Sequence, residues 1–455
     1  MIEVVPGVDD RHGRVAKSTA GHPPDSRPDE VLVGGANSAF PLPLEGCIER
    51  GAGSRVWDEQ GQEYIDFLLA SGPLILGHAH ARVCDAVAQQ LSKGSAFHAV
   101  NRPALEMAAR IADIPGCVEM VRFASTGTEA TLHAVRLARG YTGRDRVLVF
   151  AGSYHGSHDL ALIGHRGPTM ARGGGVPRGV LEDAVGARFN DLGTVEDAFV
   201  THGDSLAAVL VEPQHRSVDP LPAFLPRLAQ LCRSAGTVLI FDEVVTGFRL
   251  AFGGAQEYYG VEPDLVCYGK IMGGGFPLSA IGGRRDIMTL ADPALSSSPS
   301  FVHVSGTLSG NPISAVAGLA TLAELERPGV YDRLHGLGER LRAGLAREMR
   351  VHDVGGSVIG SGPIAAVKFS ETRQPGGDAL LRETVNRELI HRGVLVQLQT
   401  KFYISLVHTE REIDYAVDAF GAALWAATEG ESDRSKGRTF VPGLGGRQRG
   451  LATLV

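Results

Sequence analysis

From about residue 56 onward, short runs of β-branched and other apolar residues alternate with segments that have the apolar spacing of a helix. In one such unit, Leu225 and Leu228 recur at helical spacing, and Gly236 can end the helix. The run TVLIF at 237–241 follows at once as a buried strand. Strands and helices that alternate in this way are typical of a parallel sheet covered by helices. The sequence therefore predicts an α/β fold built on a mostly parallel sheet.

Polar residues follow several of the predicted strands at the point where each strand ends. Ligands of such sheets bind at the edge formed by the carboxyl ends of the strands, so these residues predict a site there. They are Asp242 after 237–241, Ser125 to Thr128 after VRF at 121–123, Tyr154 to Gly156 after RVLVF at 146–150, Glu212 after AAVLV at 207–211, and Lys270 after LVCYG at 265–269.

A chain of 455 residues is too long for one ordinary hydrophobic core. We therefore expect a large and a smaller domain between two tails, in which Asp, Arg, Pro and Gly are frequent and apolar periodicity is missing. Thr409 and Glu412 have the spacing of a capping box that opens a helix. The expected division is a tail at 1–30, an N-terminal segment of the small domain at 31–55, the large domain at 56–315, the small C-terminal domain at 316–430 and a tail at 431–455.

Charge and cysteine content exclude several classes of partner. Forty-four Lys and Arg residues against 51 Asp and Glu residues give a formal net charge of -7, which argues against nucleic acid and anionic membranes as partners. Five cysteines without C-x-x-C spacing indicate reduced thiols and neither a zinc site nor a disulfide framework. No apolar run approaches the roughly 18 residues of a membrane span. We expect a cytoplasmic protein that acts on small molecules.

Lys270 lies in the segment YGKIMGGGFPLSAIGG at 268–283, among apolar residues and three consecutive glycines. The glycines would let a flat ligand approach the backbone. Apolar surroundings favour the neutral amine, which can condense with an aldehyde to an imine. The alternative interpretation is an ordinary surface lysine before a glycine-rich turn.

Asp242 supplies a carboxylate that could pair with a pyridine nitrogen and keep it protonated, which makes the ring an electron sink. An aspartate at a strand end can also be a helix cap or a turn residue. Together with Lys270, it predicts pyridoxal phosphate bound to the lysine as a Schiff base.

The run STGT at 125–128 opens a helical segment, so its amides and hydroxyls would lie at a helix amino terminus, where a phosphate is favoured. Simple capping by Ser or Thr is the alternative. Tyr154 could lie over one face of a flat cofactor and Val244 could press on the other face. For the tyrosine, a place in the hydrophobic core is the competing interpretation.

These motifs belong to a long match with a known family. The segment FDEVVTGFRLAFGGAQEYYGVEPDLVCYGKIMGGGFPLSAIGGRRDIM at 241–288 closely resembles the cofactor-lysine region of class III pyridoxal-phosphate aminotransferases, in particular the glutamate-1-semialdehyde 2,1-aminomutase branch. The similarity continues in 121–156 and in SGTLSGNP at 305–312. A weaker match, ISLVHTEREID at 404–414, extends it toward the end of the chain.

The resemblance implies a fold type I pyridoxal-phosphate-dependent transferase, similar to aspartate aminotransferase, with a mostly parallel sheet in the large domain and a smaller α+β C-terminal domain. It implies pyridoxal 5'-phosphate as cofactor and a homodimer with shared active sites. The catalytic residues would be Lys270 in the internal aldimine, Asp242 at the pyridine nitrogen and Tyr154 stacked on the ring. The expected cofactor-binding residues are Thr126, Gly127, Thr128, Tyr154, His155, Glu212, Asp242, Val244, Lys270 and, reaching the phosphate of the partner chain, Thr307.

The sequence departs from the aminomutase pattern at positions that concern the substrate. No arginine follows Asn37 and Ser38 before Arg50, although the pattern places a carboxylate-binding arginine there. Ser71 stands in place of a tryptophan and Thr400 in place of an acidic residue. A carboxylate could instead be held by two other residues, Arg102 and Arg166, unless these are ordinary surface charges.

Two kinds of reaction fit this chemistry. An aminotransferase would move an amino group between a small amine or amino acid and a carbonyl acceptor, with Lys270 carrying the proton. An aminomutase or a racemase would use the same lysine without a separate acceptor. The sequence does not separate these reactions, because both need the same lysine and the same electron sink.

A metal-dependent hydrolase is the alternative from a different class. It is motivated by potential metal ligands at His78, His80, His155, His158 and Asp159. A non-catalytic binding module is a further alternative, but the joint presence of the lysine, the aspartate and the phosphate loop argues against it.

Overall fold

The computed structural model describes residues 32–36, 42–44, 46–166, 175–370 and 377–428. The tails expected at 1–30 and 431–455 therefore lie outside the described residues. The chain divides into two compact units, Met1–Glu45 and Gly46–Val455. In the first unit a short 3-10 turn, η1, covers Val33–Gly35. The second unit contains every other element described below.

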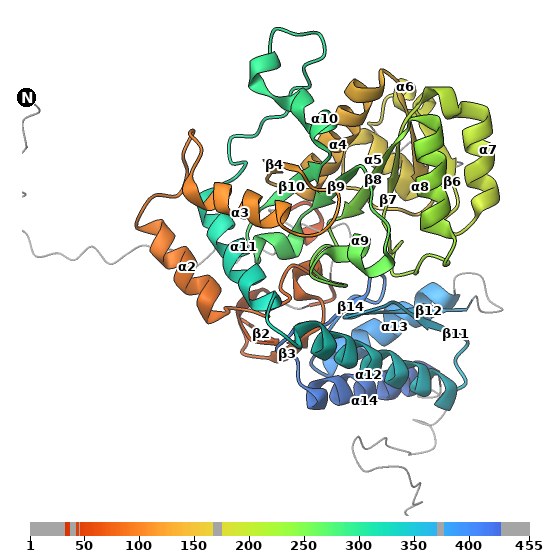
Figure 1. Cartoon of the computed structure of the whole chain (residues 1–455). Coiled ribbons are helices and arrows are strands. Elements are labelled where there is room, and N and C mark those ends of the chain that lie inside the picture. Colours follow the sequence, from red (N-terminus) through yellow and green to blue (C-terminus); the bar gives the residue numbers. More distant parts are fainter. Residues whose placement is uncertain (1–31, 37–41, 45, 167–174, 371–376, 429–455) are drawn as a thin grey trace, which may run out of the picture. The chain divides into compact units, whose positions relative to one another are not determined.

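A seven-stranded sheet is the centre of the second unit, and its strands follow the order β4-β10-β9-β8-β7-β5-β6 (Figure 1). Neighbours from β9 through β6 are parallel, whereas β10 runs antiparallel to both β9 and β4. The α/β class with a mostly parallel sheet is thus confirmed. The bounds are β4 Met120–Ala124, β5 Arg146–Phe150, β6 Ala184–Ala187, β7 Leu206–Val211, β8 Val238–Glu243, β9 Leu265–Tyr268 and β10 Ser279–Gly283.

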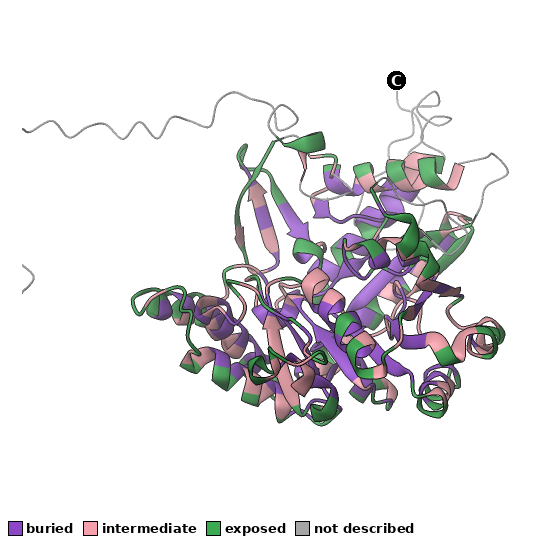
Figure 2. Ribbon diagram, turned by 90° about the horizontal axis from the view of Figure 1, so that it is seen from above, coloured by how far each residue is buried: buried purple, intermediate pink, exposed green. Residues whose placement is uncertain are grey.

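Helices cover both faces of this sheet, because alternate residues of each central strand enter different hydrophobic clusters. In β7, Val209 and Val211 pack with α8, while Ala208 and Leu210 pack with α4. All residues of β7, β8 and β9 are buried, as the purple strands of Figure 2 show. The helices of this part are α2 Ala81–Leu91, α3 Arg102–Ala112, α4 Gly127–Thr142, α5 Asp159–Arg166, α6 Arg178–Glu182, α7 Leu192–His202, α8 Phe224–Ala235, α9 Gly254–Tyr259, α10 Arg285–Met288 and α11 Pro312–Leu325.

The C-terminal part has a separate core between two small sheets and three helices. Strand β13 pairs in parallel with β3, so segments from both ends of the second unit share one sheet. The bounds are β1 Ile48–Ala52, β2 Arg55–Asp58, β3 Glu63–Asp66, β11 Gly356–Ile359, β12 Ile364–Phe369, β13 Val394–Leu395, β14 Phe402–Tyr403, α12 Val330–Val351, α13 Gly377–His391 and α14 Glu410–Thr428. The domain boundaries expected at 55, 315 and 430 stay predictions.

Local sequence signals explain several element ends. Gly236 ends α8 in the left-handed conformation, with φ 65°. The capping box before α14 is present: the amide of Thr409 donates to Glu412 Oε2 at 2.9 Å, and the amide of Glu412 donates to Thr409 Oγ1 at 3.2 Å. The remaining short 3-10 turns are η2 Leu69–Ser71, η3 Gly203–Ser205, η4 Lys270–Gly273, η5 Thr289–Ala291 and η6 Pro293–Leu295. Within the described part of the chain, the structure has no helix that is both long and apolar enough for a membrane span.

Candidate active site

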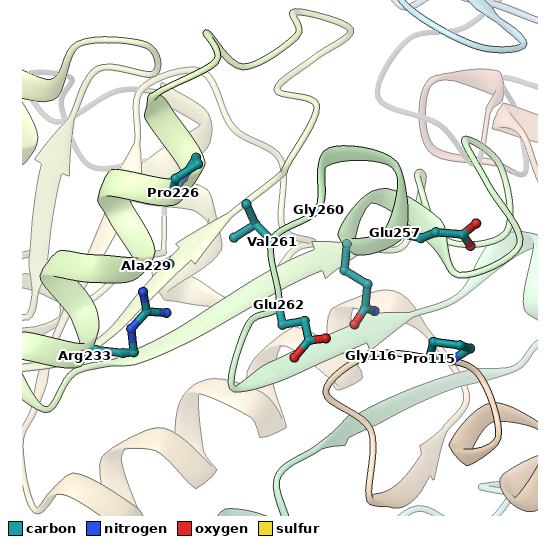
Figure 3. Close-up of a pocket in the computed structure, with 10 residues that line it drawn as sticks. Pro115, Gly116, Pro226, Ala229, Arg233, Glu257, Gly260, Val261 and Glu262 are labelled. Atoms are coloured by element: carbon teal, nitrogen blue, oxygen red, sulfur yellow. The ribbon is translucent and has the colours of Figure 1, made fainter.

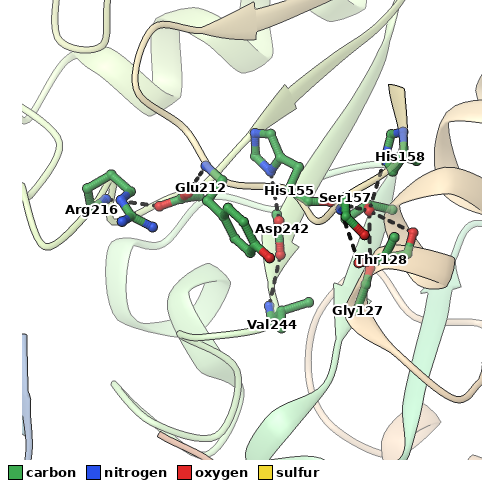
Figure 4. A network of polar contacts seen from close by, with 11 residues as sticks. Gly127, Thr128, His155, Ser157, His158, Glu212, Arg216, Asp242 and Val244 are labelled. Carbon is green, nitrogen blue, oxygen red and sulfur yellow. Dashed lines mark hydrogen bonds and ion pairs between the residues drawn. The ribbon is translucent and has the colours of Figure 1, made fainter. Parts of the chain in front are cut away.

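The carboxyl ends of four parallel strands bring the expected residues to one edge of the large sheet. Tyr154 and His155 follow β5, Glu212 follows β7, Asp242 lies near the end of β8, and Lys270 follows β9. Two contacts between strands tie them together: the amide of Tyr154 donates to Glu212 Oε1 at 2.6 Å, and His155 Nδ1 lies 2.7 Å from Asp242 Oδ2 (Figure 4).

Lys270 begins η4 and has a backbone φ of 48°. This left-handed conformation is unfavourable for a side chain with a Cβ atom, and such strain often marks functional positions. Burial lowers the pKa of Lys270 from 10.5 to about 8, and the positive charge of Arg249 acts in the same direction. A larger fraction of the amine is therefore neutral and nucleophilic near neutral pH than in an exposed lysine.

The carboxylate of Asp242 is held from two sides. Its Oδ2 faces His155 Nδ1, and its Oδ1 accepts a hydrogen bond from the amide of Val244 at 3.1 Å. Both Asp242 and His155 are buried, with exposed fractions of 6% and 1%. A carboxylate fixed in this way offers a stable negative charge at the bottom of the site, where a cationic ring nitrogen would be stabilised.

The amino terminus of α4 forms a second part of the site. Thr126 is the N-cap and shares a capping box with Glu129, so the hydroxyl of Thr126 accepts the amide of Glu129 at 3.2 Å. The capping box does not block an anion here, because it leaves the amides of Gly127 and Thr128 in the first turn, where a helix has no internal acceptor for them. The hydroxyl of Thr128 accepts the amide of Ser157 at 3.3 Å.

Glycines keep the space between these parts open. A Cβ atom on Gly127 would lie 3.0 Å from Val244 Cγ1, and one on Gly269 would lie 3.2 Å from the same atom. Gly156 has φ 103°, and a Cβ atom there would lie 2.5 Å from Thr128 Oγ1. The ring of Tyr154 is about half exposed at 49%. A flat ring with a phosphate at one end and a basic nitrogen at the other, as in pyridoxal phosphate, fits this set of groups.

The model of the family described as aminotransferase class-III matches residues 40–424. The chain belongs to the class-III aminotransferase family. Its fold is that of the fold type I pyridoxal-phosphate-dependent enzymes, and pyridoxal phosphate is its cofactor.

Named relatives of this aminotransferase-family chain carry two different descriptions. The glutamate-1-semialdehyde 2,1-aminomutase 2 of Brevibacillus brevis is 42% identical over 389 residues, which cover 82% of this chain and 89% of the relative. The crystal structure of an omega-transaminase from Sphaerobacter thermophilus has a TM-score of 0.83 at 35% identity and covers 88% of this chain and 96% of that chain. A structure described as a transaminase with PLP bound has a TM-score of 0.81 at 31% identity, with the same coverage.

Several residues singled out in the sequence lie apart from this site or outside the described residues. Thr307 is exposed in the loop before α11, and Arg102 is exposed at the first residue of α3. Arg166 ends α5, but its side chain is outside the described residues, as are Asn37 and Ser38. Ser71 is exposed in η2, where φ is 66°.

The histidines that motivated a metal site belong to separate networks. His78 Nε2 lies 2.7 Å from Asp66 Oδ2, and His158 Nε2 lies 3.3 Å from Thr131 Oγ1. Among the residues that the structure describes, no group of three or more His, Cys, Asp or Glu side chains could hold a metal ion. The observation that suggested a metal-dependent hydrolase therefore has no counterpart in the described site.

The sequence did not reveal a group of cationic residues beside Lys270. Arg216 follows Glu212 in the loop after β7, Arg249 follows β8, and Lys401 directly precedes β14. Arg249 is fully buried. Burial lowers the pKa of Lys401 from 10.5 to about 7. Arg249 lies inside the long family match, and Lys401 lies shortly before ISLVHT. These positions could have drawn attention to the two residues, but the sequence does not show that either is buried.

A cavity of about 510 Å³ lies elsewhere in the fold, between α8, α9 and the loop before β9 (Figure 3). Arg233 and Glu262 are among its lining residues, and both are near the amino ends of strands β8 and β9. Since Asp242 and Lys270 lie at the carboxyl ends of these strands, the cavity is not part of the candidate active site.

Proposed function

We propose that the chain transfers an amino group between a small amine or amino acid and a carbonyl acceptor. The observation that carries this proposal is the strained Lys270, whose amine is kept partly neutral beside the buried pair of Asp242 and His155. Pyridoxal phosphate would supply an aldehyde that accepts the amino group and a ring that takes up electrons.

Each described part of the site would have a separate task. The amides of Gly127 and Thr128 would hold the cofactor phosphate at the positive end of α4. Asp242, oriented by His155 and the amide of Val244, would keep the pyridine nitrogen protonated. The Val244 side chain and the Tyr154 ring would fix the plane of the cofactor. Lys270 Nζ would bind the cofactor, then take a proton from the substrate carbon and return it.

A panel of small amines, added to the purified holoprotein without any keto acid, tests this proposal. Transamination predicts that the cofactor absorbance changes to that of the aminated form and that one carbonyl product is released per site. Addition of a keto acid should then restore the original spectrum. Unchanged cofactor absorbance with every amine, in protein that contains the cofactor, would contradict amino transfer.

An aminomutase is the second candidate, because the name of the Brevibacillus brevis relative supports it more directly than it supports transamination. Both solved structures named above are described as transaminases, which supports the first candidate. Glutamate-1-semialdehyde supplied alone separates the two. Sustained conversion of this compound without an acceptor would identify an aminomutase. A conversion that stops after one equivalent of product per site would identify a transaminase.

We also propose that two copies of the chain form a homodimer in which Thr307 of each copy binds the cofactor phosphate of the other. Thr307 is exposed in the single chain, and the neighbouring apolar side chain of Leu308 is 54% exposed. An exposed apolar side chain here supports an interface that covers this loop. Light scattering should give twice the mass of one chain. Thr307→Val should weaken cofactor binding without changing that mass, and a monomeric holoprotein with full cofactor content would contradict the proposal.

A further inference from the structure

Four cationic side chains lie near one another at the candidate active site. The positive charges of Arg216, Lys270 and Arg249 all act on the pKa of Lys401, which places the four groups in one electrostatic neighbourhood. They come from different parts of the chain, since Lys401 belongs to the C-terminal part and the others follow strands of the large sheet. The fold therefore concentrates positive charge in one place.

Lys401 is buried, and the negative charge of Glu212 acts on its pKa without forming an ion pair with it. Its exposed fraction is 6%, and its Nζ lies 5.8 Å from the centre of the Tyr403 ring. No carboxylate of the described residues forms an ion pair with Lys401. Burial of an ammonium group without a counter-ion is unfavourable, so this arrangement reduces the stability of the chain unless a ligand supplies negative charge.

Arg249 shows a similar deficit. Its Nε donates to the carbonyl of Val245 at 3.0 Å, its Nη2 donates to the carbonyl of Gly72, and its Cζ lies 4.9 Å from the centre of the Tyr403 ring. Its Nη1 is fully buried and has no hydrogen-bond partner among the described residues. Arg249 and Lys401 thus both lie near the Tyr403 ring, and Arg249 retains a donor that the described protein groups do not use.

Arg216 is held in place by a strained and anchored loop. Arg216 and Ser217 have φ values of 49° and 75°, in the left-handed region. The amide of Arg216 donates to Glu212 Oε2 at 2.9 Å. Asp219, at the end of the loop, accepts hydrogen bonds from the hydroxyls of Tyr259 at 2.7 Å and Ser361 at 2.6 Å. The surrounding structure therefore fixes the backbone that carries the Arg216 side chain.

The charge balance indicates the kind of ligand. Glu212 is an acid whose negative charge acts on both Lys401 and Lys270. Burial alone would raise the pKa of Glu212, but His155, His215 and Arg216 hold that pKa below the ordinary value, so Glu212 is ionised. Asp242 is already paired with His155. Arg216, Arg249 and Lys401 together carry more positive charge than Glu212 neutralises. A ligand group with negative charge balances the excess.

We propose that Arg216 and Lys401, together with the free Nη1 of Arg249, form a subsite for a carboxylate group of the substrate. The enzyme would then act on amino compounds that carry a carboxylate, although the arginine expected after Asn37 is missing. This proposal rests on the proposed function, since it assigns the substrate class of the same site.

Butyrate and its uncharged analogue butyramide test the subsite by calorimetric titration of the holoprotein at pH 7. We expect the wild-type protein to bind butyrate more tightly than butyramide. Lys401→Met should weaken butyrate binding by roughly 10-fold or more, the usual effect of losing a hydrogen bond to a charged group, and leave butyramide binding unchanged. Lys401→Arg should keep most of the affinity, and Lys368→Met, at an exposed lysine of β12, is the matched control.

Each outcome decides the proposal. Absence of butyrate binding by the wild type, or an equal effect of Lys401→Met and Lys368→Met, would overturn the subsite. Propylphosphonate that binds more tightly than butyrate would overturn the carboxylate in favour of a phosphonate or phosphate group. Failure of the proposed function would look different, because no amine would then change the cofactor absorbance although butyrate binding still depended on Lys401.

Discussion

Two regions near Lys270 differ in whether their buried polar groups are paired within the protein. In the region proposed to hold the cofactor, Asp242 is paired with His155, and Thr126 forms a capping box with Glu129. In the proposed carboxylate subsite, Lys401 has no ion pair with the described residues, and Arg249 Nη1 has no hydrogen-bond partner among them. The polar groups of the first region are paired within the protein, whereas the second region has unbalanced positive charge.

This difference agrees with the roles proposed for the two regions. A cofactor that stays bound through every cycle is served by groups held in fixed orientations, and internal hydrogen bonds provide that. A substrate that enters and leaves must bring part of the pairing itself, so its binding groups remain unpaired when it is absent. Unpaired buried cations are therefore informative about the substrate.

The largest effect should come from Lys270→Ala, which removes the group that the two regions share. We expect amino transfer to fall by about 1,000-fold or more, because the proton carrier and the covalent attachment of the cofactor are both lost. Single-turnover assays with the amine panel measure this loss. Cofactor content, read from absorbance after gel filtration, shows whether the variant still binds it. Retained turnover would mean that another residue carries the proton.

A smaller effect should follow from Asp242→Asn, which tests the paired region. The amide keeps the shape of the side chain but cannot hold a positive charge on the pyridine nitrogen, so turnover should fall by about 100-fold. Asp85→Asn, at an exposed aspartate of α2, serves as the control. Equal turnover of both variants would show that the Asp242 pair supports the fold and not the chemistry.

The smallest effect should be a gain in stability from Lys401→Met, which tests the unpaired region. In the unfolded chain this lysine titrates near 10.5, but in the folded chain near 7, so between these values the unfolded state binds more protons. The stability of the wild type therefore rises with pH across this window, and the penalty for burying Lys401 is complete below about pH 7.

Urea unfolding of the holoprotein at pH 6 and pH 9 measures this penalty. Lys401→Met should raise the free energy of unfolding by roughly 1–4 kcal/mol at pH 6, with a smaller gain at pH 9. Lys368→Met should change little at either pH. A variant that is less stable than the wild type at pH 6 would show that Lys401 is paired after all.

Much of the fold followed from the sequence because the strands of the large sheet are buried on both faces and read as continuous apolar runs. The strand expected at 237–241 covers Val238–Glu243, because Asp242 and Glu243 also pair with Cys267 and Tyr268 of β9. Strand β10 at Ser279–Gly283 was not predicted, because its glycines give it the composition of a turn.

The candidate site also has residues that the sequence predicts and residues that it does not. Lys270 and Asp242 could be found because each follows or ends a predicted strand, and strand ends meet at one edge. Arg216 and Lys401 could not, because a charged residue in a loop has no periodic signal and its burial depends on segments nearly 200 positions apart in the sequence. Thr126 allowed two interpretations, and the structure shows that capping is one of them.

The backbone of Lys270 has a consequence for how this chain can change. A left-handed residue with a side chain costs about 1–2 kcal/mol relative to glycine, and the partly buried amine adds to that cost. Glycine at position 270 would make a sturdier protein without its chemistry. Selection for heat resistance alone would thus favour variants that have lost Lys270 and with it the activity. Libraries of mutants screened for heat resistance should therefore keep Lys270 unchanged.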